Sequence, residues 1–195
     1  AECELKLVPA AGKLEERVRG PNVTPGYYKR PDLTKEAFDE EGFYRIGDAV
    51  RLADPADPAK GVVFDGRVAE DFKLSTGTWV HVGALRIKLL AAANSLIQDA
   101  VITGHDRTEV GALVFLSPAA NDVDVRKKLS EVLKNLSVES GSSTRITRLL
   151  VMSDPPSIDA NEITDKGYLN QRAVLERRAA EVARLYSADP AVISA

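Results

Sequence analysis

The chain has 195 residues, of which 44% are hydrophobic and 28% are charged, so it is long enough to bury one large core or two small ones. Its formal net charge of -3 and the lack of a long run of lysine or arginine argue against a nucleic-acid partner and against an anionic membrane surface. Cys3 is the only cysteine, which excludes a disulfide within the chain and a multi-thiolate metal site and favours a reducing compartment, with the cytoplasm as the expected location.

The beginning of the chain predicts neither a membrane span nor a signal peptide. No apolar stretch reaches the roughly 20 residues that a membrane helix needs, and residues 1–13 lack the basic and apolar regions of a signal peptide. The chain opens, without a methionine, directly on a strand-like pattern. We therefore expect that the natural polypeptide begins earlier.

The first 65 residues predict short strands and turns. Residues 4–8 and 14–19 form two strand patterns around a turn, which predicts a hairpin. Residues 34–38 predict a short helix that follows a threonine cap at Thr34. Two further strands are expected at residues 49–52 and 62–65, on either side of a proline-rich loop.

The pattern changes near residue 66. Residues 79–82 alternate as a strand, and residues 84–94 carry apolar side chains at helical spacing. Two apolar strands, at residues 100–103 and 111–116, are separated by the polar turn 105–108. This change predicts a domain boundary, with one domain at residues 1–65 and another at residues 66–195.

The rest of the chain completes the second domain. A helix is expected at residues 123–136, a third strand at residues 146–152 and a last helix at residues 171–186. The first of these helices places one apolar stripe along a single side, made of Val125, Leu129, Val132, Leu133 and Leu136. Strands and helices in this order indicate an α+β fold with a small sheet covered by helices.

The most particular stretch is residues 20–48, GPNVTPGYYKRPDLTKEAFDEEGFYRIGD. It resembles the AMP-forming acyl-adenylate superfamily, which includes acyl-CoA synthetases, firefly luciferases and peptide-synthetase adenylation domains. The resemblance implies that this block closes a large N-terminal domain and that Asp48 accepts hydrogen bonds from the two ribose hydroxyls of ATP. Residues 1–65 are then expected to be a β-rich remnant of that domain, an incomplete barrel whose exposed edges offer a route to a homodimer.

Residues 66–77, GRVAEDFKLSTG, resemble the hinge and the C-terminal-domain signature of the same superfamily. The resemblance implies that Arg67 contacts the ribose hydroxyls and that Ala69, where many relatives carry Asp or Lys, is the pivot between two domain orientations. Ser75-Thr76-Gly77 would approach the active site in the thioester-forming orientation, with Gly77 allowing close contact to pantetheine. Residues 66–195 are then the lid domain. Residues 80–86 depart from the family pattern, because they lack its usual acidic residue.

The third block, residues 161–172 (NEITDKGYLNQR), resembles the segment that holds the adenylation lysine, which would be Lys166. When a carboxylate attacks the α-phosphorus of ATP, two anionic groups converge, and a mobile ammonium stabilises the developing charge. The usual Gly-Lys pair of the family is replaced here by Asp165-Lys166-Gly167, so the register rests mainly on residues 168–172.

Each of these residues also has a purely structural interpretation. Asp48 and Gly77 are residue types common in turns, and Arg67 and Lys166 are of a kind usually found as solvated surface charges. His81 and His105, the only histidines, lack the companion residues that a metal site or a catalytic triad needs, so a structural role is favoured for both. The occurrence of three blocks in the family's order, at about its spacing, favours the functional interpretation.

Within the superfamily the chain looks closest to bacterial feruloyl-CoA synthetases. The resemblance implies an acid-thiol ligase: a carboxylic acid, with an aromatic acid such as ferulate favoured, and MgATP form acyl-AMP, and CoA thiolate then attacks the adenylate after a swing about residue 69. The phosphate loop and the segment that holds adenine and Mg2+ are not found here, so ATP, Mg2+ and the acid are expected to bind mainly outside this chain. The fragment alone is expected to be inactive.

Two other functions stay open. One is an adenylating enzyme with a different acceptor, such as a carrier-protein phosphopantetheine or a reductase. The other is a noncatalytic interaction module that retains the lid fold.

Overall fold

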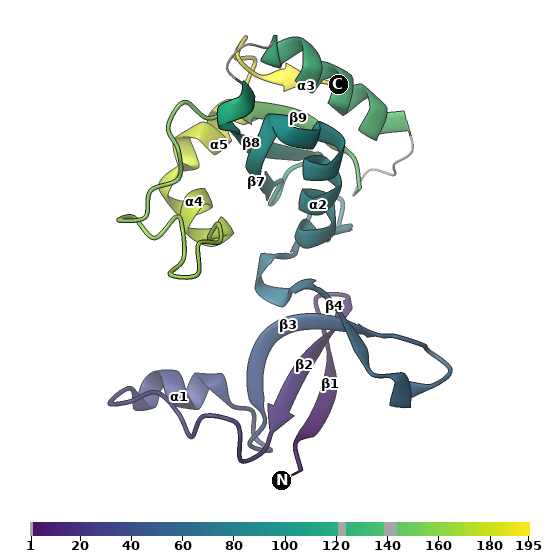
Figure 1. Ribbon diagram of the computed structural model, residues 1–195, viewed down its shortest axis with the longest axis vertical. Coiled ribbons are helices and arrows are strands. Elements are labelled where there is room, and N and C mark those ends of the chain that lie inside the picture. The colour runs from purple at the N-terminus through teal and green to yellow at the C-terminus, as the bar shows by residue number, and fades with distance from the viewer. Residues whose placement is uncertain (1, 121–123, 139–143) are drawn as a thin grey trace. The chain divides into compact units, whose positions relative to one another are not determined.

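The computed structural model describes residues 2–120, 124–138 and 144–195, and these residues form two compact units (Figure 1). Unit 1 extends to Asp71, and unit 2 consists of Phe72–Ala195. Gly66 and Arg67 end strand β4 (Val62–Arg67), which belongs to the sheet of unit 1. The structural boundary therefore lies at Asp71, a few residues beyond the change seen in the sequence at residue 66.

Unit 1 contains an open antiparallel sheet in the order β1-β2-β3-β4, in which β1 is Glu4–Ala10, β2 is Lys13–Arg19 and β3 is Tyr44–Leu52. The predicted hairpin is confirmed, and its turn narrows to Ala11 and Gly12, whose φ angles are 52° and 79°. Two positive φ values match the right-handed twist of the flanking strands. The described residues of unit 1 form no barrel, since β1 and β4 are the ends of the sheet.

The short helix of unit 1, α1 (Pro31–Ala37), begins three residues before the predicted start. Pro31 occupies the first turn, where its fixed φ is preorganised and its missing N–H costs nothing. Thr34 is therefore inside the helix and not its cap. Its hydroxyl donates to the Arg30 carbonyl at 2.9 Å and accepts from the Tyr27 amide at 2.9 Å, so the predicted threonine cap is wrong.

Unit 2 is built on a mixed sheet in the order β10-β9-β8-β7. The strands β7 (Ile97–Thr103) and β8 (Val110–Leu116) form an antiparallel hairpin, and β9 (Ile146–Val151) pairs in parallel with β8. These three strands confirm the sequence prediction. The fourth strand, β10 (Ile193–Ser194), is antiparallel to β9 and was not predicted, because two residues carry no periodic signal.

Helices cover both faces of this sheet (Figure 1). On one face, α2 (Val82–Ala93) and α3 (Val125–Val138) contribute Leu89 and Leu129 to a cluster with Ile102 of β7. On the other, α4 (Gln171–Arg177) and α5 (Ala179–Leu185) pack on the alternate strand residues, including Val101. The fold is thus α+β, as predicted.

The apolar stripe predicted for α3 lies against the sheet, with Leu129 and Leu133 fully buried. The predicted start of that helix, Val123, falls outside the described residues. None of the helices within the described residues is long and apolar enough to cross a membrane.

Two local predictions in unit 2 are corrected. The strand expected at residues 79–82 is only β6 (Trp79–Val80), which pairs with β5 (Phe72–Lys73), and His81 is already the N-cap of α2. The single helix expected at residues 171–186 is broken at Arg178, whose φ and ψ are -100° and 34°. Arg178 is held there by buried contacts of its side chain, described below.

Candidate functional site

The two residues predicted to contact the ribose lie side by side in unit 1. Asp48 in β3 is the register partner of Arg67 in β4, and the Asp48 Oδ1 lies 2.8 Å from the Arg67 Nη1. This oxygen is buried and within ion-pair distance of the guanidinium, but the angle between the two groups is not that of a hydrogen bond. The same Nη1 donates to the carbonyl of Ile46 at 3.1 Å.

Gly47 explains how Asp48 reaches this position. Its φ of 79° lies in the region that favours glycine, and the pairing of β3 with β4 shifts register just after Asp48. A bulge of this kind redirects a side chain within a strand. Asp48 and Arg67 therefore present an acceptor and a donor together at the sheet, with the Arg67 side chain 53% exposed.

The predicted pivot, Ala69, lies in a 3₁₀ turn, Val68–Glu70, and is exposed. The segment around it is tied down by Lys13 of β2, which sequence reasoning did not identify. The Lys13 ammonium is 2.9 Å from the Asp71 carboxylate, donates to the Asp65 carbonyl, and is almost fully buried. Lys13 thus links the residues before Ala69 to those after it.

Ser75-Thr76-Gly77 forms the exposed tip of the turn that joins β5 to β6 in unit 2. The Leu74 amide donates to the Thr78 carbonyl at 3.0 Å, and the Gly77 amide donates to the Leu74 carbonyl at 2.8 Å. Gly77 has a φ of 82°, and a Cβ there would meet no atom within 4 Å. Its glycine is required by the backbone angle, and the tip leaves open space on this side.

Lys166 lies at the tip of a second turn in unit 2. Ile163 and Leu169 form an isolated bridge at its base, and the Thr164 amide donates to the Tyr168 carbonyl at 2.8 Å. Gly167, with a φ of 80°, completes the turn. Among the described residues, no hydrogen bond or ion pair engages the ammonium of Lys166, which is exposed. It is an exposed positive charge on a defined support.

That support rests on a buried ion pair which the sequence analysis missed. Glu162 is fully buried, and its two carboxylate oxygens accept from Arg178 at 2.8 and 2.9 Å. Arg177 lies 3.1 Å from the same carboxylate, and the Ser157 amide donates to it at 2.8 Å. The Arg178 guanidinium also donates to the carbonyls of two residues that precede the turn, Asp154 and Pro155.

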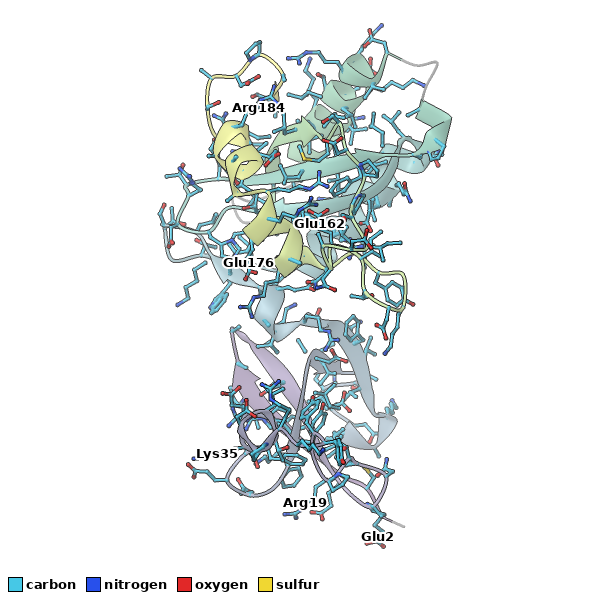
Figure 2. All side chains as sticks on the ribbon, turned by 90° about the vertical axis from the view of Figure 1, so that its left-hand side faces the viewer. Glu2, Arg19, Lys35, Glu162, Glu176 and Arg184 are labelled. Carbon is cyan, nitrogen blue, oxygen red and sulfur yellow. The ribbon has the colours of Figure 1, made fainter. Side chains whose placement is uncertain are left out.

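These contacts change the titration of Glu162. The hydrogen bonds from Arg178, followed by the Ser157 amide and the charges of both arginines, lower its pKa from 4.5 to about 2, against the effect of burial. The carboxylate is therefore charged at neutral pH. Figure 2 shows Glu162 within unit 2, whereas Glu176 and Arg184 lie on the exposed sides of α4 and α5.

One signal could have revealed this pair. Arg178 stands three and four residues from Leu175 and Val174, on the stripe by which the last helix packs. A charged residue on a buried stripe indicates a buried partner. The partner itself, 16 residues earlier in an irregular loop, could not be identified from spacing.

The structure thus brings Asp48 and Arg67 together in unit 1, and it places Ser75-Thr76-Gly77 and Lys166 on two separate exposed turns of unit 2. His81 caps a helix, and His105 stacks on Phe72 with 4.2 Å between ring centroids. Within the described part of the chain, no three His, Cys, Asp or Glu side chains are grouped to hold a metal ion. Arg67 and Lys166 carry hydrogen-bond donors and positive charge of the kind that an anionic ligand requires.

Comparison with known proteins points to the same family that the three sequence blocks resemble. A model of the AMP-binding enzyme C-terminal domain matches residues 73–190, more than half of the chain. The probable acyl-activating enzyme 16, chloroplastic, of Arabidopsis thaliana is 28% identical over 203 residues, which cover 92% of this chain and 28% of the relative. The chloroplastic long-chain-fatty-acid–acyl-carrier-protein ligase AEE15 of the same plant is 29% identical over 194 residues, which cover 93% and 26%.

Among solved structures, the chain is similar to the A domain of carboxylic acid reductase from Segniliparus rugosus, determined in complex with AMP and a co-purified carboxylic acid. The TM-score is 0.77 and the identity 26%, over 95% of this chain and 31% of that one. This chain therefore spans about a third or less of the length of these relatives.

Proposed function

This chain belongs to the AMP-binding enzyme C-terminal domain family, and on that premise we propose that it is the C-terminal part of an ATP-dependent acid-thiol ligase. The whole protein forms an acyl-AMP from a carboxylic acid and ATP, and then transfers the acyl group to CoA. The observation that carries the proposal is the pair Asp48 and Arg67. Two separate sequence blocks each supply one residue expected at the ribose, and the fold brings them to 2.8 Å.

In the first half-reaction, the carboxylate of Asp48 accepts hydrogen bonds from the ribose hydroxyls, and Arg67 donates to them and keeps Asp48 oriented. Lys166 supplies its ammonium where the substrate carboxylate meets the α-phosphate. The chain's own part in this step is to place charge and hydrogen bonds. On the basis of the family resemblance, Mg2+ and most of the ATP site are proposed to lie in polypeptide outside this chain.

In the second half-reaction, unit 2 presents Ser75-Thr76-Gly77 to the pantetheine arm of CoA after a rotation about Ala69. An exposed residue in a short 3₁₀ turn is suited to absorb such a change of dihedral angles, once the ion pair of Lys13 with Asp71 is released. We propose ferulate as the acid on the basis of the resemblance of the three sequence blocks, and the cytoplasm as the location.

The test uses the full-length parent enzyme with ferulate, benzoate and dodecanoate as acids. ATP–pyrophosphate exchange and acyl transfer from preformed feruloyl-AMP to CoA are measured for wild type, Lys166→Ala and the control Lys134→Ala, which removes an exposed lysine of α3. We expect Lys166→Ala to lower exchange about 10²- to 10³-fold, to retain most of the transfer, and Lys134→Ala to behave as wild type.

Unchanged exchange in Lys166→Ala would refute the role of Lys166 and favour a noncatalytic module that retains the lid fold. A wild type that is active with benzoate or dodecanoate but not with ferulate would refute only the choice of acid. A wild type without exchange on any of the three acids would refute the proposed activity itself.

A carrier protein is the second candidate for the acceptor. Two of the relatives favour it, since one is named as a ligase that uses acyl-carrier-protein and another was solved as the A-PCP didomain of a carboxylic acid reductase. The same transfer assay with CoA and with a phosphopantetheinylated carrier protein decides between them. Faster transfer to the carrier would replace CoA as the proposed acceptor.

A further inference from the structure

We propose that the turn between β7 and β8, residues 104–108, positions the loop Ser75-Thr76-Gly77 for acyl transfer, with Gly104 and His105 as positioning residues. The chemistry of this inference rests on the proposed function of the loop. Its structural part rests on three contacts within unit 2, and we call residues 104–108 the supporting turn.

The first contact is a backbone hydrogen bond. The Ser75 amide donates to the carbonyl of Arg107 at 2.8 Å, and the supporting turn is itself closed by the Arg107 amide, which donates to the Gly104 carbonyl at 3.0 Å. The two turns are therefore joined at the first residue of the loop. A bond between main chains fixes the position of Ser75 without using its side chain.

The second contact is a pair of stacked rings. His105 lies on Phe72 with ring centroids 4.2 Å apart and an angle of 26° between the planes. Phe72 is buried and begins the short hairpin that carries the loop. His105 is exposed, and partial desolvation of its ring lowers its pKa against the opposing charge of Asp106, which favours the neutral ring for stacking.

The third contact explains why residue 104 is glycine. Its φ is 154°, and an added Cβ would lie 2.9 Å from the Glu109 carbonyl oxygen, 3.1 Å from Phe72 and 3.3 Å from Leu74. Any side chain would push the supporting turn away from the two residues that lead into the loop. Only glycine permits this close approach.

The loop is thus supported on one side and open on the other. Ser75, Thr76, Gly77 and Thr78 are exposed, and space is free around the Cα of Gly77. A loop that must contact an extended thiol-bearing arm through its backbone benefits from such an arrangement, because the reacting geometry is set before the arm binds.

The test compares two glycines at which an added Cβ would meet other atoms at similar distances, and of which Gly104 alone has a positive φ. In the full-length enzyme, Gly104→Ala disturbs the supporting turn, whereas Gly111→Ala overpacks β8 of the same hairpin, where a Cβ would lie 2.8 Å from Leu185 and 3.1 Å from the Tyr186 hydroxyl. Both are measured by ATP–pyrophosphate exchange and by transfer from preformed feruloyl-AMP to CoA. We expect Gly104→Ala to lower transfer about 10- to 100-fold more than exchange and to raise the KM for CoA.

Gly111→Ala is expected to change exchange and transfer in the same proportion. A second pair of variants serves if Gly104→Ala does not fold. His105→Ala removes the stacked ring without a clash and should lower transfer selectively, and His105→Phe should restore it. Equal losses of exchange and transfer in both Gly104→Ala and His105→Ala would overturn the inference.

Failure of the inference can be told from failure of the proposed function. If wild type performs both half-reactions and these variants do not separate them, only the positioning role is wrong. If wild type performs neither with ferulate, benzoate or dodecanoate, the proposed function is wrong. Hydrogen exchange of the Ser75 amide provides an independent check, since faster exchange in Gly104→Ala than in Gly111→Ala is expected, and equal rates would contradict the structural part.

Discussion

The described residues of unit 1 include three buried apolar side chains, Phe43, Ala49 and Val50, whereas unit 2 buries apolar side chains on both faces of its sheet. The described part of unit 1 contributes to neither of the two apolar clusters. It also leaves large apolar side chains in contact with solvent, among them Phe64 of β4, which is 63% exposed. Each unit is therefore stabilised internally by a different kind of interaction.

Charged groups take the place of a core in unit 1. The carboxylate of Asp39 lies 2.7 Å from the Lys6 ammonium and accepts a hydrogen bond from Arg17 at 3.1 Å. Hydrogen bonding from Lys6 is the main cause that holds the pKa of Asp39 well below its usual value. Partly buried pairs of this kind specify which strands and turns meet, but they give little net stability because the ions lose hydration.

In unit 2 the buried carboxylate of Glu162 is paired with Arg178, while apolar side chains form the two clusters on the faces of the sheet. The comparison shows that ion pairing has two uses in this chain. In unit 1 it links strands and turns to one another, and in unit 2 it holds one irregular loop whose tip carries Lys166. Stability should therefore respond to apolar truncation in unit 2 more than in unit 1.

The largest effect is expected from breaking the buried pair of unit 2. Glu162→Gln removes the counter-charge of a buried guanidinium and should lower the free energy of unfolding by about 3–5 kcal/mol. Glu176→Gln, which breaks an exposed pair with Arg172, is the control and should cost about 0.5 kcal/mol or less. Urea unfolding followed by the fluorescence of Trp79, the only tryptophan, measures both. A similar cost for the two variants would contradict the importance of burial.

A somewhat smaller effect sharpens the contrast between the two cores. Leu113→Ala in unit 2 should cost about 3 kcal/mol, because it removes a fully buried side chain of β8 and leaves a cavity. Val50→Ala in unit 1 should cost about 1.5 kcal/mol, the value for two buried methylene-sized groups with little surrounding core. The two variants are compared by urea unfolding with circular dichroism, which reports on both units. An equal or larger loss for Val50→Ala would remove the distinction drawn here.

Acid should weaken unit 2 through Glu162. The pKa of this group is lowered from 4.5 in the unfolded chain to about 2 in the folded one. Its contribution is therefore fully present above pH 4.5 and is lost as the pH falls toward 2. The stability difference between wild type and Glu162→Gln, measured by urea unfolding from pH 7 to pH 3, should narrow over this window. A difference that stays constant with pH would show that the charge of Glu162 does not matter.

The smallest effect is expected at the solvent-facing apolar surface of unit 1. Phe64→Ser changes a mostly exposed side chain and should alter the free energy of unfolding by about 0.5 kcal/mol or less. Val114→Ser, at a fully buried position of β8, is the matched apolar-to-serine control and should cost several times more. Thermal unfolding of both variants provides the measurement, and a large loss for Phe64→Ser would mean that unit 1 has more core than its burial indicates.

Predictions from the sequence were most accurate where buried positions recur regularly along the chain. The strands of unit 2 are buried on both faces and read as apolar runs, and the stripe of α3 has helical spacing, so both were identified. Errors fell at element ends, at the unpredicted strand β10, and at Arg178, where a helix predicted as continuous is broken. Thr34 was taken as a cap, and residues 81–82 as strand, because capping depends on neighbours that a periodic pattern does not include.

The candidate site likewise combines residues that short motifs identify with contacts that only the fold creates. The types and order of Asp48, Arg67, Ala69, Ser75-Thr76-Gly77 and Lys166 were recognised from short local motifs, and their roles stay predictions. The contacts that position them join distant residues: Lys13 with Asp71, Ser75 with Arg107, and Glu162 with Arg178. None of these pairings is marked by spacing.

The amino-acid sequence by itself determined the α+β class and the family resemblance, because periodic burial and contiguous motifs are local properties of a chain. Only the tertiary structure decided which charged side chains form ion pairs and which turn supports the loop at residues 75–77. Those choices depend on backbone pairing and on desolvation, which arise when segments far apart in sequence are packed together.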